Sequence, residues 1–137
     1  EHTDEFSVGR IRNDLQESME ENAKIFRSEE TLSKQTEILE NLRERYENVT
    51  IFDKGKVFNT ELMEAIELDY LLDMSESTVA SALARKESRG AHSRQDFPDR
   101  DDGNFMKHSF AFKNGNSANL RYKDVELGKY EPMERKY

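Results

Sequence analysis

The sequence predicts an all-α fold, a bundle of three helices to which a C-terminal β-hairpin and an extended tail are added. Apolar residues recur every three or four positions over long stretches of the first 89 residues, as in amphipathic helices. Hydrophobic residues make up only 34% of the 137 and charged residues 36%, which suits an elongated bundle with thin apolar seams. After residue 105, apolar and polar residues alternate instead, which is typical of strands.

The first two helices are expected over residues 8–26 and 29–47. Ser28 is a favourable N-cap for the second, and Glu29 and Glu30 suit the positive end of its dipole. The first helix has its apolar stripe at Val8, Ile11, Leu15, Met19, Ala23 and Phe26. The second has its seam at Leu32, Gln35, Leu39, Leu42 and Tyr46.

The third helix is expected over residues 60–89, with Asn59 as its N-cap. Phe58 and Met63 are spaced to form a hydrophobic staple, and Gly90 is the expected C-terminal stop. Its apolar contacts are expected from Leu62, Ile66, Leu68, Leu71, Leu72, Val79 and Leu83. Its second half is rich in serine and alanine, so a neighbouring backbone can approach it closely.

The remaining segments are a loop over residues 90–105, a hairpin over about 106–126 and a tail over 127–137. Asn114, Gly115 and Asn116 supply the hairpin turn. The whole chain is thus predicted as a single domain, residues 1–137, with a spectrin-repeat-like bundle.

The charge pattern and composition exclude several classes of function. Residues 1–76 carry a net charge of −11 and residues 77–137 only +3, which argues against a nucleic-acid surface. The absence of cysteine excludes disulfides, thiolate nucleophiles and cysteine-ligated metals within the chain. No apolar run approaches the roughly 20 residues that span a bilayer, so no direct membrane insertion is expected.

The segment from Arg85 to Arg94 is the strongest candidate for function. It crowds Arg85, Lys86, Arg89 and Arg94 around Ser88 and His92, with one acid, Glu87. Guanidinium groups in such a cluster can hold carboxylates or phosphates, and a histidine can transfer protons near neutral pH. The alternative is structural: the cations cap the helix and pair with Glu87, Asp96, Asp99, Asp101 and Asp102 to fix the loop. The residue types alone leave both readings open and favour the second.

The sequence contains no complete active site. His2, His92 and His108 are too scattered to suggest a metal site. Ser88 and His92 lack an evident third member of a catalytic triad. The six glycines are dispersed, so no phosphate-binding glycine loop exists.

Four segments resemble the C-terminal domain of the flavoprotein subunit of succinate dehydrogenase and fumarate reductase. They are IRNDLQESMEENAKIFRSEE from Ile11, VFNTELMEAIEL from Val57, ALARKESRGAHSRQDFPDRDDGNFMKHSFAF from Ala82 and the terminal PMERKY. L-aspartate oxidase, a related flavoprotein, shares the SRG-x-H core, but RDDGNFMKH fits the dehydrogenase and reductase branch better.

The resemblance implies a place in a larger enzyme. The family's complete subunit binds FAD, interconverts succinate and fumarate, and passes electrons to an iron–sulfur subunit. The family's flavin and dicarboxylate residues lie upstream, so none is carried over, and this fragment is expected to hold no cofactor, metal or activity of its own. Cytoplasmic localisation is expected, with membrane association only through partner subunits of the full complex.

The matching residues of the loop are expected at a domain or subunit interface: Arg85, Glu87, Ser88, Arg89, Gly90, His92 and Arg94. The resemblance implies that this segment meets the FAD and capping domains and the iron–sulfur subunit. We expect Arg89 and Arg94 to bond groups in those partners, Gly90 to allow a sharp turn and His92 to act as a neutral hydrogen-bonding wedge. Three alternatives remain: an autonomous interaction module that binds through its acidic face, the same domain of an L-aspartate oxidase-like protein, and an enzyme with a pocket at His92.

Overall fold

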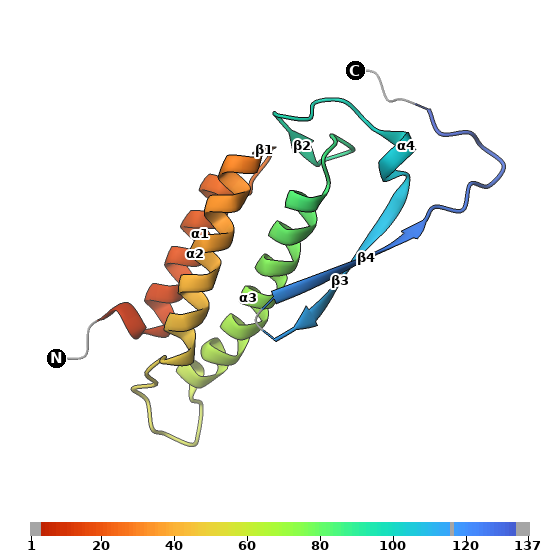
Figure 1. Cartoon of the computed structure of the whole chain (residues 1–137). Helices are drawn as coiled ribbons and strands as arrows, with labels where there is room; N and C mark the ends of the chain where they lie inside the picture. The colour runs from red at the N-terminus through yellow and green to blue at the C-terminus, as the bar shows by residue number, and fades with distance from the viewer. Residues whose placement is uncertain (1–3, 116, 134–137) are drawn as a thin grey trace.

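Three long helices and a β-hairpin make up most of the computed structural model, which describes residues 4–115 and 117–133. The helices are α1 (Val8–Asn22), α2 (Glu29–Glu47) and α3 (Thr60–Ala84), and a short 3-10 helix (Asp4–Phe6) precedes α1. The helices run alongside one another, and the hairpin lies against α3 (Figure 1). The mostly helical fold with a small hairpin was predicted, whereas the likeness to a spectrin repeat stays a prediction.

The start of α2 was predicted correctly, but α1 is shorter than expected. Ser28 caps α2 through a reciprocal pair of hydrogen bonds with Thr31. The predicted first helix, residues 8–26, instead ends at Asn22. The buried Asn22 amide donates to the carbonyl of Ser18 and to the side chain of Gln35, which ties the helix end to α2. Phe26, predicted to lie in the seam, is 68% exposed.

The third helix was also predicted too long, to residue 89 instead of Ala84. Asn59 caps its N-terminus as expected, accepting from the backbone N–H of Leu62 at 2.8 Å. At the other end Arg85 adopts an extended conformation, and the Arg94 guanidinium donates to the carbonyls of Ala82 and Leu83. A side chain distant in sequence therefore satisfies the last turn, and Gly90 is not the helix stop.

The core lies between the three helices and consists of twelve buried apolar residues: Val8, Ile11, Leu15, Ala23, Leu32, Leu39, Leu42, Ala65, Leu68, Leu72, Val79 and Ala82. The core residues of α3, Ala65, Leu68, Leu72, Val79 and Ala82, are spaced by three, four or seven positions and so lie on one face of the helix. Three residues expected to contribute, Leu62, Ile66 and Leu71, are instead 46%, 45% and 42% exposed. The predicted staple does not form, because Phe58 is 94% exposed. Six large apolar residues of α3 are therefore exposed: Leu62, Met63, Ile66, Tyr70, Leu71 and Met74.

The four strands form two small sheets of two strands each. Strands β1 (Phe26–Arg27) and β2 (Ser93–Arg94) pair in parallel, which the sequence did not predict. Strands β3 (Lys107–Asn114) and β4 (Ser117–Asp124) form the predicted antiparallel hairpin, with Asn114 opposite Ser117. Gly115 has φ +62° in the turn, whereas Asn116 lies outside the described residues. The predicted loop 90–105 contains β2 and a helical turn, α4 (Asp102–Phe105).

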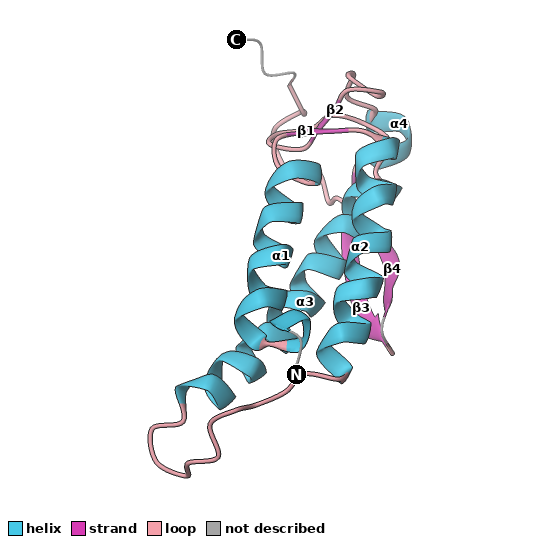
Figure 2. Ribbon diagram, turned by 90° about the vertical axis from the view of Figure 1, so that its left-hand side faces the viewer, coloured by secondary structure: helices cyan, strands magenta, loops and turns pink. Residues whose placement is uncertain are grey.

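The hairpin covers the small-residue half of α3 (Figures 1 and 2). Lys113 on β3 pairs with Asp73 at 2.7 Å, and Asp73 also accepts from the buried Arg43 of α2. Residues 127–133 of the predicted tail have no helix or strand, and residues 134–137 of the PMERKY segment lie outside the described residues. None of the described helices is long and apolar enough to cross a membrane.

Candidate docking loop

The arginine loop, residues 85–94, is organised around the carboxylate of Glu87, which is fully buried. Glu87 Oε1 accepts from Arg85 Nη1 at 2.6 Å and from Arg89 Nε at 2.8 Å. Its Oε2 accepts from Arg89 Nη2 at 3.0 Å and from the backbone N–H of Asp101 at 2.8 Å. Four donors from three places in the chain therefore meet on one carboxylate.

These donors set the charge state of Glu87. Burial alone raises the pKa of a carboxyl group, because the charged form loses its hydration. Hydrogen bonds from Arg89, from the Asp101 backbone and from Arg85 outweigh burial and hold the pKa of Glu87 below its usual value. The group is therefore ionised at neutral pH and pairs with both guanidinium groups.

Arg85 connects the end of α3 to the hairpin. Its Nη1 also donates to the carbonyl of Phe105, and its Nη2 donates to the carbonyl of Lys107 at 2.6 Å and to Ser109 Oγ at 3.0 Å. Arg89 reaches in another direction and pairs with Asp102 at 2.6 Å at the start of α4. The two arginines on Glu87 thus fix the position of α4 and β3 relative to α3.

Arg94 is also fully buried, and all three of its guanidinium nitrogens have partners. Nε and Nη2 each donate to a different oxygen of Asp96 at 2.8 Å, and Nη2 donates to Glu29 Oε2 at 2.8 Å. Nη1 donates to the two carbonyls at the end of α3. The hydrogen bonds from Arg94 hold the pKa of Asp96 far below its ordinary value. Arg94 therefore joins α3, the N-terminus of α2 and its own loop.

Ser88 and Gly90 shape the backbone of the loop. Ser88 Oγ accepts from the N–H of Arg94 at 2.8 Å and donates to the carbonyl of Phe97 at 2.8 Å. Arg89 and His92 exchange two backbone hydrogen bonds, and Gly90 lies between them with φ +60°. A residue with a Cβ is strained at that angle, so glycine allows the predicted sharp turn here, outside α3.

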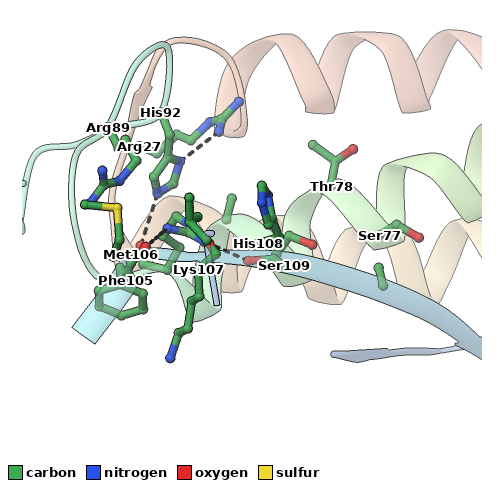
Figure 3. Close-up of a pocket in the computed structure, with 15 residues that line it drawn as sticks. Arg27, Ser77, Thr78, Arg89, His92, Phe105, Met106, Lys107, His108 and Ser109 are labelled. Carbon is green, nitrogen blue, oxygen red and sulfur yellow. Dashed lines mark hydrogen bonds between the residues drawn. The ribbon is translucent and has the colours of Figure 1, made fainter. Parts of the chain in front are cut away.

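His92 lies against the end of α3 and the β1 segment (Figure 3). Its Nε2 donates to the carbonyl of Arg85 at 3.1 Å, because a carbonyl can only accept. Its Nδ1, 3.0 Å from Arg27 Nη1, must then accept. Burial, together with the charges of Arg27, Arg94 and Arg85, lowers the pKa of His92. These contacts agree with the neutral hydrogen-bonding role expected for this residue.

The loop shows no catalytic arrangement among the described residues. The hydroxyl of Ser88 bonds to a carbonyl rather than to His92, so no nucleophile and base are paired. No group of three or more histidine, aspartate or glutamate side chains in residues 4–115 and 117–133 could hold a metal ion. What the geometry supports instead is the structural alternative, in which cations of the loop pair with Glu87, Asp96 and Asp102. Asp99 and Asp101 contribute backbone groups, as an acceptor to Ser88 and a donor to Glu87.

Sequence reasoning missed two features of this region. Arg27 was placed at a helix break without a role, but it hydrogen-bonds His92, which is 65 residues further along the chain. Nothing in the local pattern predicts that contact. Leu62, Ile66 and Leu71 were expected to make core contacts, although the apolar residues of α3 follow two stripes. One passes through Ala65, Leu68, Leu72, Val79 and Ala82, and the other passes through Leu62, Ile66, Tyr70 and Met74 at intervals of four. The second stripe is exposed.

Comparison with known proteins places the chain in a family. The family described as "Fumarate reductase flavoprotein C-term" matches residues 12–137. The fumarate reductase flavoprotein subunit of Haemophilus influenzae is 40% identical over 132 residues, which cover 96% of this chain and 22% of the relative. The succinate dehydrogenase flavoprotein subunit of Rickettsia felis is 42% identical over 121 residues, which cover 88% of this chain and 20% of the relative.

A solved structure shows the same similarity. A chain of quinol fumarate reductase from Escherichia coli superposes with a TM-score of 0.89 at 40% identity, covering 93% of this chain and 22% of that one. The chain therefore spans about a fifth of the length of the relatives it matches. Sequence and structure lead to the same family, and the chain belongs to the C-terminal domains of succinate dehydrogenase and fumarate reductase flavoprotein subunits.

Proposed function

We propose that this chain is a non-catalytic helical domain that docks onto the FAD and capping domains of its flavoprotein subunit. In the complete protein those domains hold FAD and interconvert succinate and fumarate, and this domain helps to position them beside the iron–sulfur subunit. The family to which the chain belongs supports the proposal, as does its share of about a fifth of the length of its relatives. The protein would be cytoplasmic and reach a membrane only through partner subunits.

The observation that carries the proposal is the apolar stripe of α3, which we define as Leu62, Met63, Ile66, Tyr70 and Met74. These side chains are 45–66% exposed. They lie on the helix face opposite the core residues Ala65, Leu68 and Leu72, at intervals that repeat the helical turn. Contiguous exposed apolar surface of this kind marks an interaction site in a soluble protein.

The hairpin shows what covers this face further along the helix. On the second half of α3, Ser77 and Ser81 face β3 across a shared cavity, and Ala80 faces β4 residue Ala118 across another. The first half carries large apolar residues on the continuation of that face, and these side chains are 45–66% exposed. We infer that another part of the same subunit packs there, because most of the length of the relatives lies outside the matched region.

The tip of the arginine loop is a second contact in the proposed docking. This exposed tip is Gly90 and Ala91, flanked by the half-buried Arg89 and His92. This tip meets the rest of the subunit or the iron–sulfur partner, while Arg85, Glu87, Ser88 and Arg94 hold its shape from inside. Arg94 contributes only indirectly, since its side chain has no exposed surface and all its nitrogens are bonded within the chain.

The test is to titrate the purified chain into the separately expressed remainder of the subunit and measure the heat of binding. Ile66→Asp should weaken binding by about 30-fold, roughly 2 kcal/mol, the loss typical of a central apolar contact. Ile25→Asp is the matched control, because Ile25 is 56% exposed but lies outside the stripe.

Ile25→Asp should bind like the unmodified chain, and binding should change little with salt, since apolar contacts are not screened. Equal losses for both variants would contradict docking through the stripe. Absence of binding by the folded, unmodified chain would contradict docking altogether and favour an autonomous interaction module.

A further inference from the structure

A cavity of about 700 Å³ lies between the second half of α3, strand β3 and the segment that carries β1 (Figure 3). Four cationic side chains line it: Arg27, Arg85, Arg89 and Lys107. None of its lining residues, all of which belong to the described part of the chain, is acidic. The cavity therefore combines an excess of positive charge with room for a ligand group.

Arg27 differs from the other arginines of the cavity in its partners. Arg85 and Arg89 both pair with Glu87, and Arg89 pairs with Asp102 as well. The Nε of Arg27 donates instead to the carbonyls of Ala23 and Lys24, at 3.0 and 2.9 Å. Within residues 4–115 and 117–133 no carboxylate bonds to Arg27. Burial lowers the pKa of its guanidinium, as expected for a cation without a counter-charge.

The neutral imidazole of His92 fixes how Arg27 lies. Because Nε2 of His92 donates to the Arg85 carbonyl, Nδ1 is an acceptor and receives one hydrogen of Arg27 Nη1. Figure 3 shows the two side chains joined at the edge of the cavity. Within the described residues, Arg27 Nη2 bonds to no other group. One edge of the fork, with a hydrogen on each terminal nitrogen, is thus available to an anion.

Two of the hydroxyl groups that line the cavity already donate to backbone carbonyls. Thr78 Oγ1 donates to the carbonyl of Met74 at 2.7 Å, and Ser77 Oγ donates to that of Asp73 at 2.9 Å. Lys107 lies over the rings of Phe105 and Tyr122. A single guanidinium fork matches the two oxygens of a carboxylate.

We propose that this cavity is a carboxylate-binding site, with the free edge of the Arg27 guanidinium as its anchor and His92 as the residue that orients Arg27. The carboxylate belongs either to an acidic side chain of the remaining subunit or to a free organic acid. Both would supply the counter-charge that Arg27 lacks. The site does not depend on the apolar stripe of α3.

The test is a titration of the 137-residue chain with sodium acetate, in which total sodium is held constant with sodium chloride. The NMR signals of Arg27 Nε–H and the His92 ring report binding. We expect a saturable shift of both signals in the unmodified chain. In the Arg27 variants the His92 ring is the reporter, and its saturable shift should be lost in Arg27→Gln and weakened in Arg27→Lys, because lysine keeps the charge but not the fork. Arg10→Gln, at a 57% exposed arginine side chain of α1, is the control and should titrate like the unmodified chain.

Two further outcomes separate the sources of the carboxylate. Saturation in the chain but not in the complete subunit would show that an acidic side chain of the subunit occupies the site. Saturation in both would assign it to a free acid. A linear, non-saturating shift of both signals in the unmodified chain would overturn the proposal, and this outcome does not depend on how well Arg27→Gln folds. Ile66→Asp should leave the titration unchanged, so this proposal and docking through the stripe can fail separately.

Discussion

The arginine loop and the apolar stripe of α3 differ from what their compositions suggest. The loop is rich in charge, yet its central groups are directed inward: Glu87 and Arg94 are fully buried and bonded on several sides. The stripe consists of residues that usually form a core, yet Tyr70 and Met74 are 64% and 66% exposed. The residue types of a segment therefore predict poorly whether its surface is free to bind a partner. Whether its polar groups are already hydrogen-bonded within the chain is a better guide.

The physical reason lies in how each kind of group is stabilised. A buried charge is costly unless nearby groups pair with it. A loop that buries two charges therefore bonds both of them within a closed network. An apolar helix face needs only contact, and any neighbour of suitable shape can provide it. The loop thus stabilises this domain, whereas in the proposed function the stripe packs against another domain of the subunit.

The largest expected effect is on the closed network. Glu87→Gln leaves Arg85 and Arg89 without their shared carboxylate and should lower the free energy of unfolding by about 3–5 kcal/mol. Urea unfolding followed by circular dichroism measures it. Glu44→Gln, at an exposed position of α2, should change stability by less than about 0.5 kcal/mol. Similar values for the two variants would show that the loop is not a stabilising network.

The two faces of α3 should respond differently to the loss of an apolar side chain. Leu68→Ala removes a fully buried side chain and should cost about 3 kcal/mol of unfolding free energy in the same urea experiment. Ile66→Ala, at a 45% exposed position two residues earlier, should cost less than about 1 kcal/mol. Equal costs would mean that the stripe contributes to the core of the domain.

The network should also make stability depend on pH. The pKa values of Glu87 and Asp96 are lowered, so their contribution is present at neutral pH and is lost as pH falls below the ordinary carboxyl range. The pKa of His92 is lowered too, and the unfolded chain takes up that proton near pH 6.5. Since the unfolded state binds more protons in both windows, stability should fall with decreasing pH in two steps.

Denaturant midpoints measured between pH 8 and pH 3 follow both steps. His92→Gln should remove the part of the upper step that arises from this imidazole and leave the lower one. A profile of His92→Gln identical to that of the unmodified chain would argue against a neutral His92 in the fold.

The smallest effects are expected from two glycines. Gly90→Ala should destabilise the chain by about 1 kcal/mol, because φ is +60° although no neighbouring atom lies within 4 Å of the added methyl group. Gly9→Ala, in α1 with equal free space, should stabilise it by about 0.5–1 kcal/mol. Thermal unfolding of both variants measures the difference, and equal shifts would contradict a strained turn at Gly90.

Much of this fold could be predicted from local patterns. Ser28 and Asn59 were identified as caps, and the hairpin boundaries follow from alternation and from the turn at Gly115. The ends of α1 and α3 were missed because groups distant in sequence determine them: Gln35 bonds to Asn22, and Arg94 bonds to the carbonyls of Ala82 and Leu83. No local pattern contains those contacts.

The candidate site was predicted in composition but not in arrangement. The acids expected to pair with the loop cations include Glu87, Asp96 and Asp102, all of which do so. The contact between Arg27 and His92 could not be predicted, since it depends on the parallel pairing of β1 with β2. The exposure of the stripe could not be predicted either, because periodicity places residues on a face but does not show what lies against that face.

Methionine oxidation is the most direct test of the claim that the stripe, and not the arginine loop, is the main docking surface. Met63 and Met74 belong to the stripe and are 60% and 66% exposed, whereas Met133 in the tail is 85% exposed. Brief treatment with hydrogen peroxide, followed by mass spectrometry, should oxidise all three in the isolated chain. In the complete flavoprotein subunit we predict that Met63 and Met74 are oxidised at least tenfold more slowly than in the isolated chain. Oxidation of Met63 and Met74 at the same rate in the complete subunit as in the isolated chain would contradict the account.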